Sequence, residues 1–192
     1  MKDLIFASNN AHKLDEIRAM LPAGFRLLSQ SDAGFDLDVD ETGKTFEDNA
    51  FLKAQALYEF AGITCFADDS GLEVKALKGQ PGVKSARYSG EPVNHQRNVE
   101  LLLKNLEGKK DRSARFVTVI CLRHNDKTMY FEGEVKGVIV DYPRGDKGFG
   151  YDPIFIPDGH DRTFAEMESQ EKNAISHRKR AVEKMLEFIP YL

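Results

Sequence analysis

The chain has 192 residues, which is enough for one domain with a substantial buried core. Its net charge of −4 argues against a protein whose main partner is the phosphate backbone of DNA or RNA. No apolar run approaches the roughly 20 residues of a membrane span, and the first residues lack a signal-peptide pattern. We therefore expect a cytoplasmic protein that binds neither nucleic acid nor membrane.

The first part of the sequence alternates predicted strands and helices. Residues 3–8 are typical of a strand, residues 11–21 of a helix and residues 25–28 of a short strand. A second helix is predicted over 45–61, because apolar residues recur there at three- and four-residue spacing behind a threonine suited to cap it. Gly62 is suited to end that helix.

Two adjacent carboxylates follow the next predicted strand, residues 64–67. Since Ser70-Gly71 is a turn signal, we expect Asp68 and Asp69 at the carboxyl end of this strand, where ligands of open α/β sheets gather. Paired carboxylates near a core repel each other unless a cation or hydrogen-bond donors compensate, and a divalent metal would do so. An Asp that caps a turn beside a solvated neighbour is the competing interpretation.

The second part of the sequence predicts a helix over 94–106, then a hairpin of two long strands, 112–123 and 128–140. A short strand at 154–156 and a last helix that begins at Ser176-His177-Arg178 complete the chain. Alternating strands and helices followed by a hairpin indicate an α/β fold with a mixed sheet. Both cysteines lie in strand-like apolar runs and are expected to be buried free thiols.

The turn after the first strand is suited to an anion. Ser8, Asn9, Asn10 and Lys13 place a hydroxyl, two amides and an ammonium at the start of a helix. Asn10 is equally an ordinary N-cap, and Lys13 opposes the helix dipole unless an anion is near. The sequence contains no P-loop motif.

Two further segments carry weaker signals. Residues 145–152 fail as a dinucleotide fingerprint, but the glycines that flank Phe149 suit a loop offering an aromatic face to a planar ligand, with Asp152 as an acceptor. Core packing of the aromatic residues is the alternative. His177 and Arg178 put basic groups at a helix start, which is unfavourable for the dipole and marks either a functional site or a solvated basic turn.

Taken in order, these segments resemble the inosine/xanthosine triphosphate pyrophosphatases, which remove deaminated purine nucleoside triphosphates. The resemblance covers nearly the whole chain and rests on residues 10 and 13, 41–46, 49–50, 53–54, 67–72, 81–82, 85–90, 148–153, 172–173 and 176–178. The family's first turn commonly reads Thr-Gly-Asn, whereas this chain has Ser8-Asn9-Asn10. We expect the phosphate loop to survive, because Asn tolerates positive φ better than most residues.

The resemblance implies an elongated α/β fold in which a long twisted mixed sheet carries helices that form two lobes around a substrate cleft. Residues 1–192 would be one such domain, assembled as a homodimer. It also implies hydrolysis of a purine nucleoside triphosphate such as ITP, dITP or XTP to the monophosphate and pyrophosphate, with Mg²⁺ as cofactor. The alternative is a nucleotide-binding regulatory module on the same scaffold without turnover, which the intact acidic residues disfavour.

The resemblance assigns Asp69 as the proton acceptor for water, Glu41 and Asp69 as metal ligands, and Asp68 as a supporting acid. Further residues are implied to bind the substrate: Ser8, Asn9, Asn10, Ala11, His12, Lys13, Lys53, Ser70, Phe149, Gly150, Tyr151, Asp152, Lys172, His177 and Arg178. Hypoxanthine presents an acceptor at O6 where adenine presents an amino group, so donors such as His177 and Arg178 favour the keto base.

Overall fold

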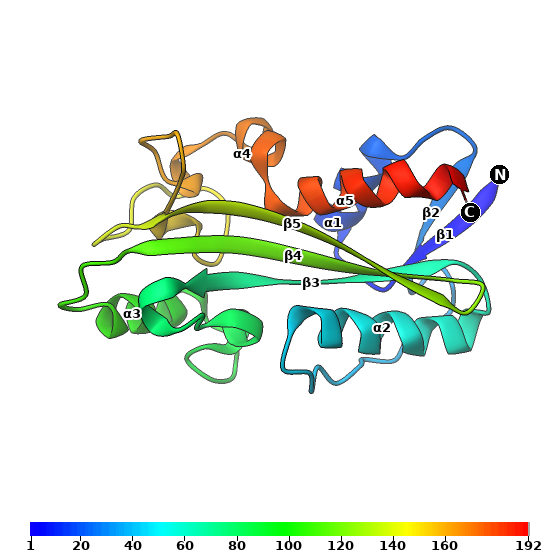
Figure 1. The fold of residues 1–192 in the computed structure, drawn as a ribbon, viewed down its shortest axis with the longest axis horizontal. Coiled ribbons are helices and arrows are strands. Elements are labelled where there is room, and N and C mark those ends of the chain that lie inside the picture. Colours follow the sequence, from blue (N-terminus) through cyan, green and yellow to red (C-terminus); the bar gives the residue numbers. More distant parts are fainter. Residues whose placement is uncertain (192) are drawn as a thin grey trace. The chain divides into compact units, whose positions relative to one another are not determined.

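The computed structural model describes residues 1–191, except the side chain of His12 (Figure 1). The chain folds into two compact units, each built from segments that are distant in sequence. Unit 1 comprises Met1–Asp69, Thr118–Gly133 and Lys179–Leu192, and unit 2 comprises Ser70–Val117 and Glu134–Arg178. The chain therefore passes from unit 1 into unit 2 between Asp69 and Ser70.

A six-stranded sheet has the order β2-β1-β3-β4-β5-β6. Its strands are β1 (Lys2–Phe6), β2 (Phe25–Ser29), β3 (Cys65–Val74), β4 (Ser113–His124), β5 (Lys127–Ile139) and β6 (Phe155–Pro157). Strand β1 pairs in parallel with β2 and β3, whereas β5 pairs with β6 in the antiparallel sense. The mixed sheet confirms the predicted α/β class.

The α-helices are α1 (Ala11–Met20), α2 (Phe46–Ala61), α3 (His95–Asn105), α4 (Ser169–Ile175) and α5 (His177–Phe188). Short 3-10 turns lie at Lys75–Leu77, Gly82–Arg87, Asp152–Ile154, Phe164–Glu166 and Ile189–Tyr191. Helices α1, α2, α3 and α5 agree with the sequence patterns, but α4 was missed. None of the helices in the described part of the chain is long and apolar enough to cross a membrane.

Helix α2 begins and ends where its sequence predicts. The Thr45 side chain accepts a hydrogen bond from the Asp48 N–H at 3.1 Å, and the Asp48 side chain accepts one from the Thr45 N–H at 3.1 Å. Gly62 closes the helix in the left-handed conformation, with φ of 67°. The helix is therefore fixed at both ends by local interactions.

In unit 1, helices cover both faces of the sheet (Figure 1). Ala50 of α2 packs with Ala67 of β3, whereas Leu14 of α1 and Val182 of α5 pack with Phe66. Because successive side chains of a strand point to opposite faces, residue 68 follows Phe66 to the α1 face and residue 69 follows Ala67 to the α2 face. The two neighbouring carboxylates therefore lie on opposite faces of the sheet, next to different helices.

The prediction that β3 ends at Asp68 and Asp69 is wrong, because the strand continues to Val74. Leu72 and Val74 are fully buried and pack with Leu102 of α3 in the core of unit 2. This apolar burial and the pairing with β4 override the local turn preference of Ser70-Gly71. The carboxylates thus lie inside a long strand, at the point where it passes from one unit to the other.

The two cysteines, Cys65 and Cys121, are free and fully buried, as the sequence predicts. Burial raises the pKa of the Cys65 thiol to about 12, and the nearby Cys121 contributes in the same direction. Both thiols are therefore neutral near pH 7 and serve as small core residues.

Candidate functional site

The first turn of unit 1 builds a capped helix start. The Asn10 side chain accepts a hydrogen bond from the Lys13 N–H at 3.2 Å and is the N-cap of α1. Ser8 Oγ accepts from the Asn10 N–H at 3.1 Å. The turn therefore fixes the polar groups around the positive end of the helix, where an anion is stabilised.

Asn9, Ala11 and His12 are the other residues of this turn that were predicted to bind the substrate. Asn9 does not have a positive φ, so the left-handed conformation that an asparagine would tolerate here is not required. Its side chain instead accepts from the Ser31 N–H at 3.1 Å. Ala11 is the exposed first residue of α1, and the side chain of His12 lies outside the described part of the chain.

Lys13 and Asp68 form an ion pair between α1 and β3. The Lys13 ammonium lies 2.8 and 3.0 Å from the two carboxylate oxygens of Asp68. Asp68 is 4% exposed, so its charge needs a partner within the fold. The same contact explains a basic residue in the first turn of α1, because Asp68 supplies the anion that the helix dipole otherwise lacks.

Asp69 is held from the opposite face of the sheet by Asn49 of α2. The Asn49 amide donates to Asp69 Oδ2 at 3.1 Å, and its oxygen accepts from the Gly43 N–H at 2.8 Å. Asn49 is 1% exposed, so its amide makes these hydrogen bonds within the fold and links Asp69 to the loop before α2. Gly43 is required there, since a Cβ would lie 2.6 Å from Asn49 Oδ1.

Sequence reasoning placed Asn49 within a family motif without giving it a role. The available signal was an amide at helical spacing from Phe46 and Ala50, on the apolar face of the predicted helix. A buried amide on such a face needs hydrogen-bond partners, and those partners here are Asp69 and the Gly43 backbone.

Lys53 completes the group in unit 1. Its ammonium lies 2.5 Å from Glu41 Oε1 and 4.0 Å from Asp69 Oδ1. Burial lowers the pKa of Lys53, but the negative charges of Asp68, Asp69 and Glu41 outweigh this effect and leave the pKa above its ordinary value. The lysine is therefore charged in the folded protein. Together with the Lys13–Asp68 pair, the cluster holds three carboxylates and two ammonium groups, an excess of one negative charge.

This donor set fits a magnesium ion. Among the residues that the structure describes, no group of three or more His, Cys, Asp or Glu side chains is arranged to hold a metal. Mg²⁺ commonly takes only one or two protein carboxylates, with water and substrate phosphates as its other ligands. Glu41 and Asp69 both approach the Lys53 ammonium, which shows that a cation at this position is compatible with their geometry.

In unit 2, Asp152 organises the glycine-flanked aromatic loop. Asp152 Oδ2 accepts from the Phe149 N–H at 2.9 Å and from the Lys172 ammonium at 2.5 Å. The same ammonium lies 4.9 Å from the centroid of the Phe149 ring. Asp152 is 4% exposed, whereas Phe149 is 64% exposed. The carboxylate thus fixes the loop from within and leaves the aromatic ring available to a planar ligand.

Tyr151 differs from its neighbours in the loop. Its side chain is 4% exposed, belongs to the core of unit 2 and donates to the Ser85 carbonyl at 2.8 Å. Any contact of Tyr151 with a ligand would therefore come from its backbone. Gly150, which precedes it, has φ of +62°. His95 at the start of α3 lies near Phe149, with ring centroids 6.2 Å apart, and no sequence pattern singled it out.

The basic helix start predicted at Ser176 to Arg178 is present in unit 2. Helix α5 begins at His177, whose imidazole stacks on Phe116 with centroids 5.1 Å apart and planes inclined by 14°. Arg178 follows it, and both side chains are partly buried. The stack fixes the orientation of the imidazole, which makes His177 more than a solvated surface residue.

The predicted site residues therefore form two groups. The group in unit 1 comprises Ser8 to Lys13, Glu41, Lys53, Asp68 and Asp69. The group in unit 2 comprises Ser70, Phe149 to Asp152, Lys172, His177 and Arg178. Asp69, in the first group, and Ser70, in the second, are consecutive residues of β3.

We expect Gly148→Ala to disturb this loop more than Gly150→Ala. Both glycines have positive φ, so each alanine would be strained by about 1 to 2 kcal/mol. Only at position 148 would the added Cβ overlap the Asp152 carboxylate. Chemical denaturation and the KM for ITP, a substrate that the resemblance implies, measure the difference between the two variants. Equal losses would mean that the Asp152 contact does not shape the loop.

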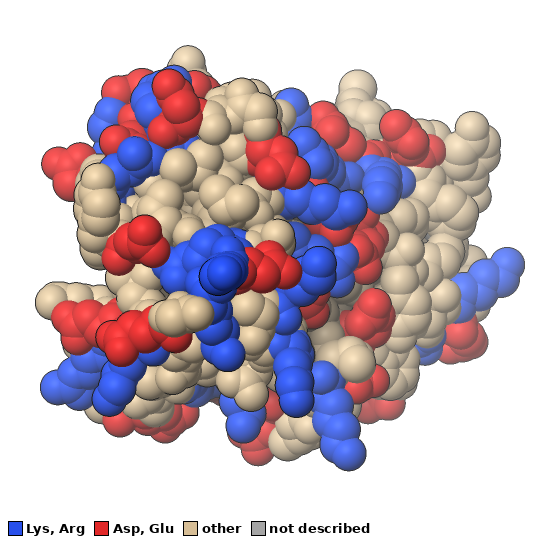
Figure 2. Space-filling view, turned by 60° about the vertical axis from the view of Figure 1, so that its left-hand side comes forward, with Lys and Arg blue, Asp and Glu red and all other residues tan. Residues whose placement is uncertain are grey.

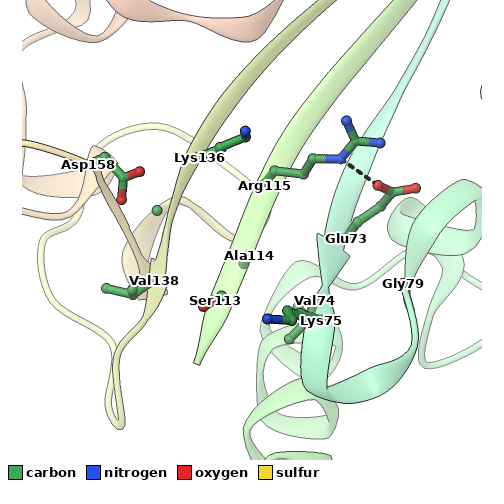
Figure 3. Close-up of a pocket in the computed structure, with 11 residues that line it drawn as sticks. Glu73, Val74, Lys75, Gly79, Ser113, Ala114, Arg115, Lys136, Val138 and Asp158 are labelled. Carbon is green, nitrogen blue, oxygen red and sulfur yellow. Dashed lines mark hydrogen bonds and ion pairs between the residues drawn. The ribbon is translucent and has the colours of Figure 1, made fainter. Parts of the chain in front are cut away.

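A pocket with a volume of about 380 Å³ lies in unit 2 (Figure 3). It contains none of the predicted site residues. The cations of its lining are paired, since Arg115 contacts both Glu73 and Glu134 at 2.7 Å, Lys136 lies 3.3 Å from Glu134 and Lys75 lies 3.5 Å from Asp111. The three cations of the lining therefore already have carboxylate partners and do not single out an anionic ligand.

Comparison with known proteins gives a consistent result. A sequence model of the Ham1 family matches residues 4–188. A dITP/XTP pyrophosphatase of Flavobacterium psychrophilum is 50% identical over 185 residues, covering 96% of this chain and 97% of the relative. The solved Ham1 protein of Staphylococcus aureus superimposes with a TM-score of 0.93 at 42% identity, covering 99% of both chains. A HAM1 protein from Coxiella burnetii gives a TM-score of 0.95 at 39% identity, covering 100% of both.

Proposed function

The chain belongs to the Ham1 family, and on this premise we propose that it hydrolyses deaminated purine nucleoside triphosphates, such as dITP and XTP, to the monophosphate and pyrophosphate. The observation that carries the proposal is the arrangement around Asp69, a nearly buried carboxylate that Asn49 orients beside the Lys53–Glu41 pair. Relatives that match nearly the full chain bear the name dITP/XTP pyrophosphatase.

The triphosphate is assigned to the residues of unit 1. The start of α1 offers backbone N–H groups, and Lys13 and Lys53 offer two ammonium groups. Both lysines are now paired with carboxylates, so binding a phosphate exchanges one anionic partner for another. Such an exchange avoids the cost of leaving a buried charge without a partner.

Asp69 is assigned as the base. Water attacks the α-phosphorus, its proton passes to the Asp69 carboxylate, and the bond from the α-phosphorus to the bridging oxygen breaks to release pyrophosphate. The Asn49 amide donates to Asp69 Oδ2, which orients the carboxylate and leaves Oδ1 on the side of Lys53. Glu41 and Asp69 would hold Mg²⁺, which stabilises negative charge on phosphate oxygens and lowers the pKa of bound water.

The purine base of the substrate is assigned to the residues of unit 2. The exposed ring of Phe149 offers a stacking surface, and Lys172 and Asp152 hold its loop in place. His177 and Arg178 offer donors for the O6 acceptor of hypoxanthine or xanthine. Adenine has an amino group at that position and would leave these donors without an acceptor, which disfavours ATP.

The proposal is tested by measuring monophosphate and pyrophosphate release from a panel of nucleoside triphosphates, with and without Mg²⁺. We expect ITP, dITP and XTP to be hydrolysed well above ATP, with pyrophosphate rather than inorganic phosphate as the second product. Binding of ITP without product release would favour a non-catalytic nucleotide-binding module. Release of inorganic phosphate would contradict the assigned bond cleavage.

We expect Glu41→Gln to raise the Mg²⁺ concentration that gives half-maximal rate by roughly 10-fold, because an amide is a weaker ligand than a carboxylate. Asp40→Asn is the matched control, since it removes an exposed charge from the neighbouring position. Rates are measured across a Mg²⁺ titration at fixed ITP. An unchanged metal dependence in Glu41→Gln would remove Glu41 from the metal site.

Nucleic-acid binding through the basic last helix has little support. The net charge is −4, and the face drawn in Figure 2 shows Lys and Arg side chains interspersed with Asp and Glu. Backbone binding to RNA would weaken steeply with salt, so a salt titration tests this alternative. The homodimer and the cytoplasmic location remain predictions from the sequence, and light scattering in solution would test the first.

A further inference from the structure

Lys53 occupies the position between the two carboxylates that we assign to the metal. Its ammonium lies 2.5 Å from Glu41 Oε1 and 4.0 Å from Asp69 Oδ1. The three side chains are 18%, 29% and 11% exposed, in the order Lys53, Glu41 and Asp69. Lys53 and Asp69 are thus largely shielded from solvent, whereas Glu41 remains partly open to it, and the lysine is a cation that both carboxylates approach.

The backbone of Lys53 is held in place because it belongs to helix α2. Lys53 follows Asn49 by four residues, which places both side chains on the same face of the helix. Asn49 holds Asp69 and the backbone of Gly43, so one helix supplies both the amide that orients the base and the cation beside it. The lysine side chain has four flexible carbons, so its ammonium can move while its backbone stays in place.

An ammonium and a magnesium ion compete for Glu41 Oε1. Mg²⁺ binds carboxylate oxygens at about 2.0 to 2.1 Å, and a magnesium ion bound to Glu41 Oε1 would be repelled by an ammonium within hydrogen-bond distance of that oxygen. A triphosphate offers the displaced ammonium new anionic partners. The metal and the nucleotide would then favour each other's binding through the position of one side chain.

Building on the proposed function, we infer that Lys53 substitutes for the metal in the free protein and moves to the triphosphate when Mg²⁺ binds between Glu41 and Asp69. The lysine keeps the carboxylates together before the substrate arrives. It also weakens the binding of free metal, because the metal must displace it. The metal and nucleotide sites are thereby coupled.

The test is a calorimetric titration of Mn²⁺ and Mg²⁺ into the full chain without nucleotide, comparing the parent with Lys53→Met. We expect the variant to bind metal on the order of 10-fold more tightly, within the range of ordinary coupling between sites. Lys13→Met is the matched control: it removes an equal charge that is paired with Asp68 instead. A general electrostatic effect would raise metal affinity equally in both variants, and that result would overturn the inference.

Thermal unfolding gives a second readout that does not depend on activity. In EDTA, Lys53→Met should unfold at a lower temperature than the parent, because Glu41 and Asp69 lose their cation. Added Mg²⁺ should raise its unfolding temperature by more than it raises that of the parent. Equal rises in the two proteins would also contradict the displacement of Lys53.

Lys53→Arg keeps the test decisive if Lys53→Met does not fold. The guanidinium retains the positive charge and the reach to both carboxylates, so we expect metal affinity within about 3-fold of the parent, well short of the 10-fold effect. Much tighter metal binding by Lys53→Arg, or unchanged or weaker binding by Lys53→Met, would overturn the inference. Failure of the parent to hydrolyse ITP would overturn the proposed function instead, and the nucleotide-free titration would still report on Lys53.

Discussion

Asp69→Asn is expected to lower turnover by roughly 10² to 10⁴, the usual contribution of a positioned general base. The amide is close in shape to the carboxylate, and its oxygen can still accept the hydrogen bond that Asn49 donates to residue 69. It cannot accept a proton from water at neutral pH. The loss should therefore appear in kcat, with the unfolding transition near that of the parent.

The weaker metal binding expected of Asp69→Asn is separated from the loss of the base by raising Mg²⁺ to saturation, where the reduced kcat should persist. Asp68→Asn serves as the control, because it changes the neighbouring carboxylate, which pairs with Lys13 on the other face of the sheet. We expect its main effect in KM. Turnover of Asp69→Asn near the parent value would show that another group accepts the proton.

Arg178→Ala is expected to reduce the ratio of kcat/KM for ITP to that for ATP by about 10- to 100-fold. Losing a charged hydrogen-bond partner is worth about 1.5 to 3 kcal/mol, and only ITP presents an acceptor at position 6 of the base. The effect should therefore fall on ITP and largely spare the residual hydrolysis of ATP. Both nucleotides are measured on the same preparation, which corrects for any loss of folded enzyme.

Arg180→Ala is the matched control, since it removes an exposed arginine from the same helix two residues away. Its ITP-to-ATP ratio should stay near that of the parent. If Arg178→Ala slows both nucleotides in proportion, the arginine serves the phosphates or the fold, and the mechanism proposed for base selection is wrong.

The helices show how far local signals reach. Helix α2 starts at its Thr45 cap and ends at Gly62 as predicted, because capping and left-handed closure involve residues within four positions of each other. Helix α4 was missed, since its seven residues are too few for an apolar repeat to show. The family resemblance inferred from the motifs is confirmed by the family model and by relatives that match nearly the full chain.

The sequence by itself determined the fold class, the family and the kinds of residue at the site, because caps, periodicity and motif order are local properties of the chain. Only the tertiary structure decided which charges meet. Because side chains alternate along the strand, Asp68 contacts Lys13, 55 residues away, on one face of the sheet. On the other face Asp69 contacts Asn49, 20 residues away, and Lys53, 16 residues away. Strand pairing and a buried apolar face likewise carried β3 past the Ser70-Gly71 turn signal, since long-range burial outweighs local preference.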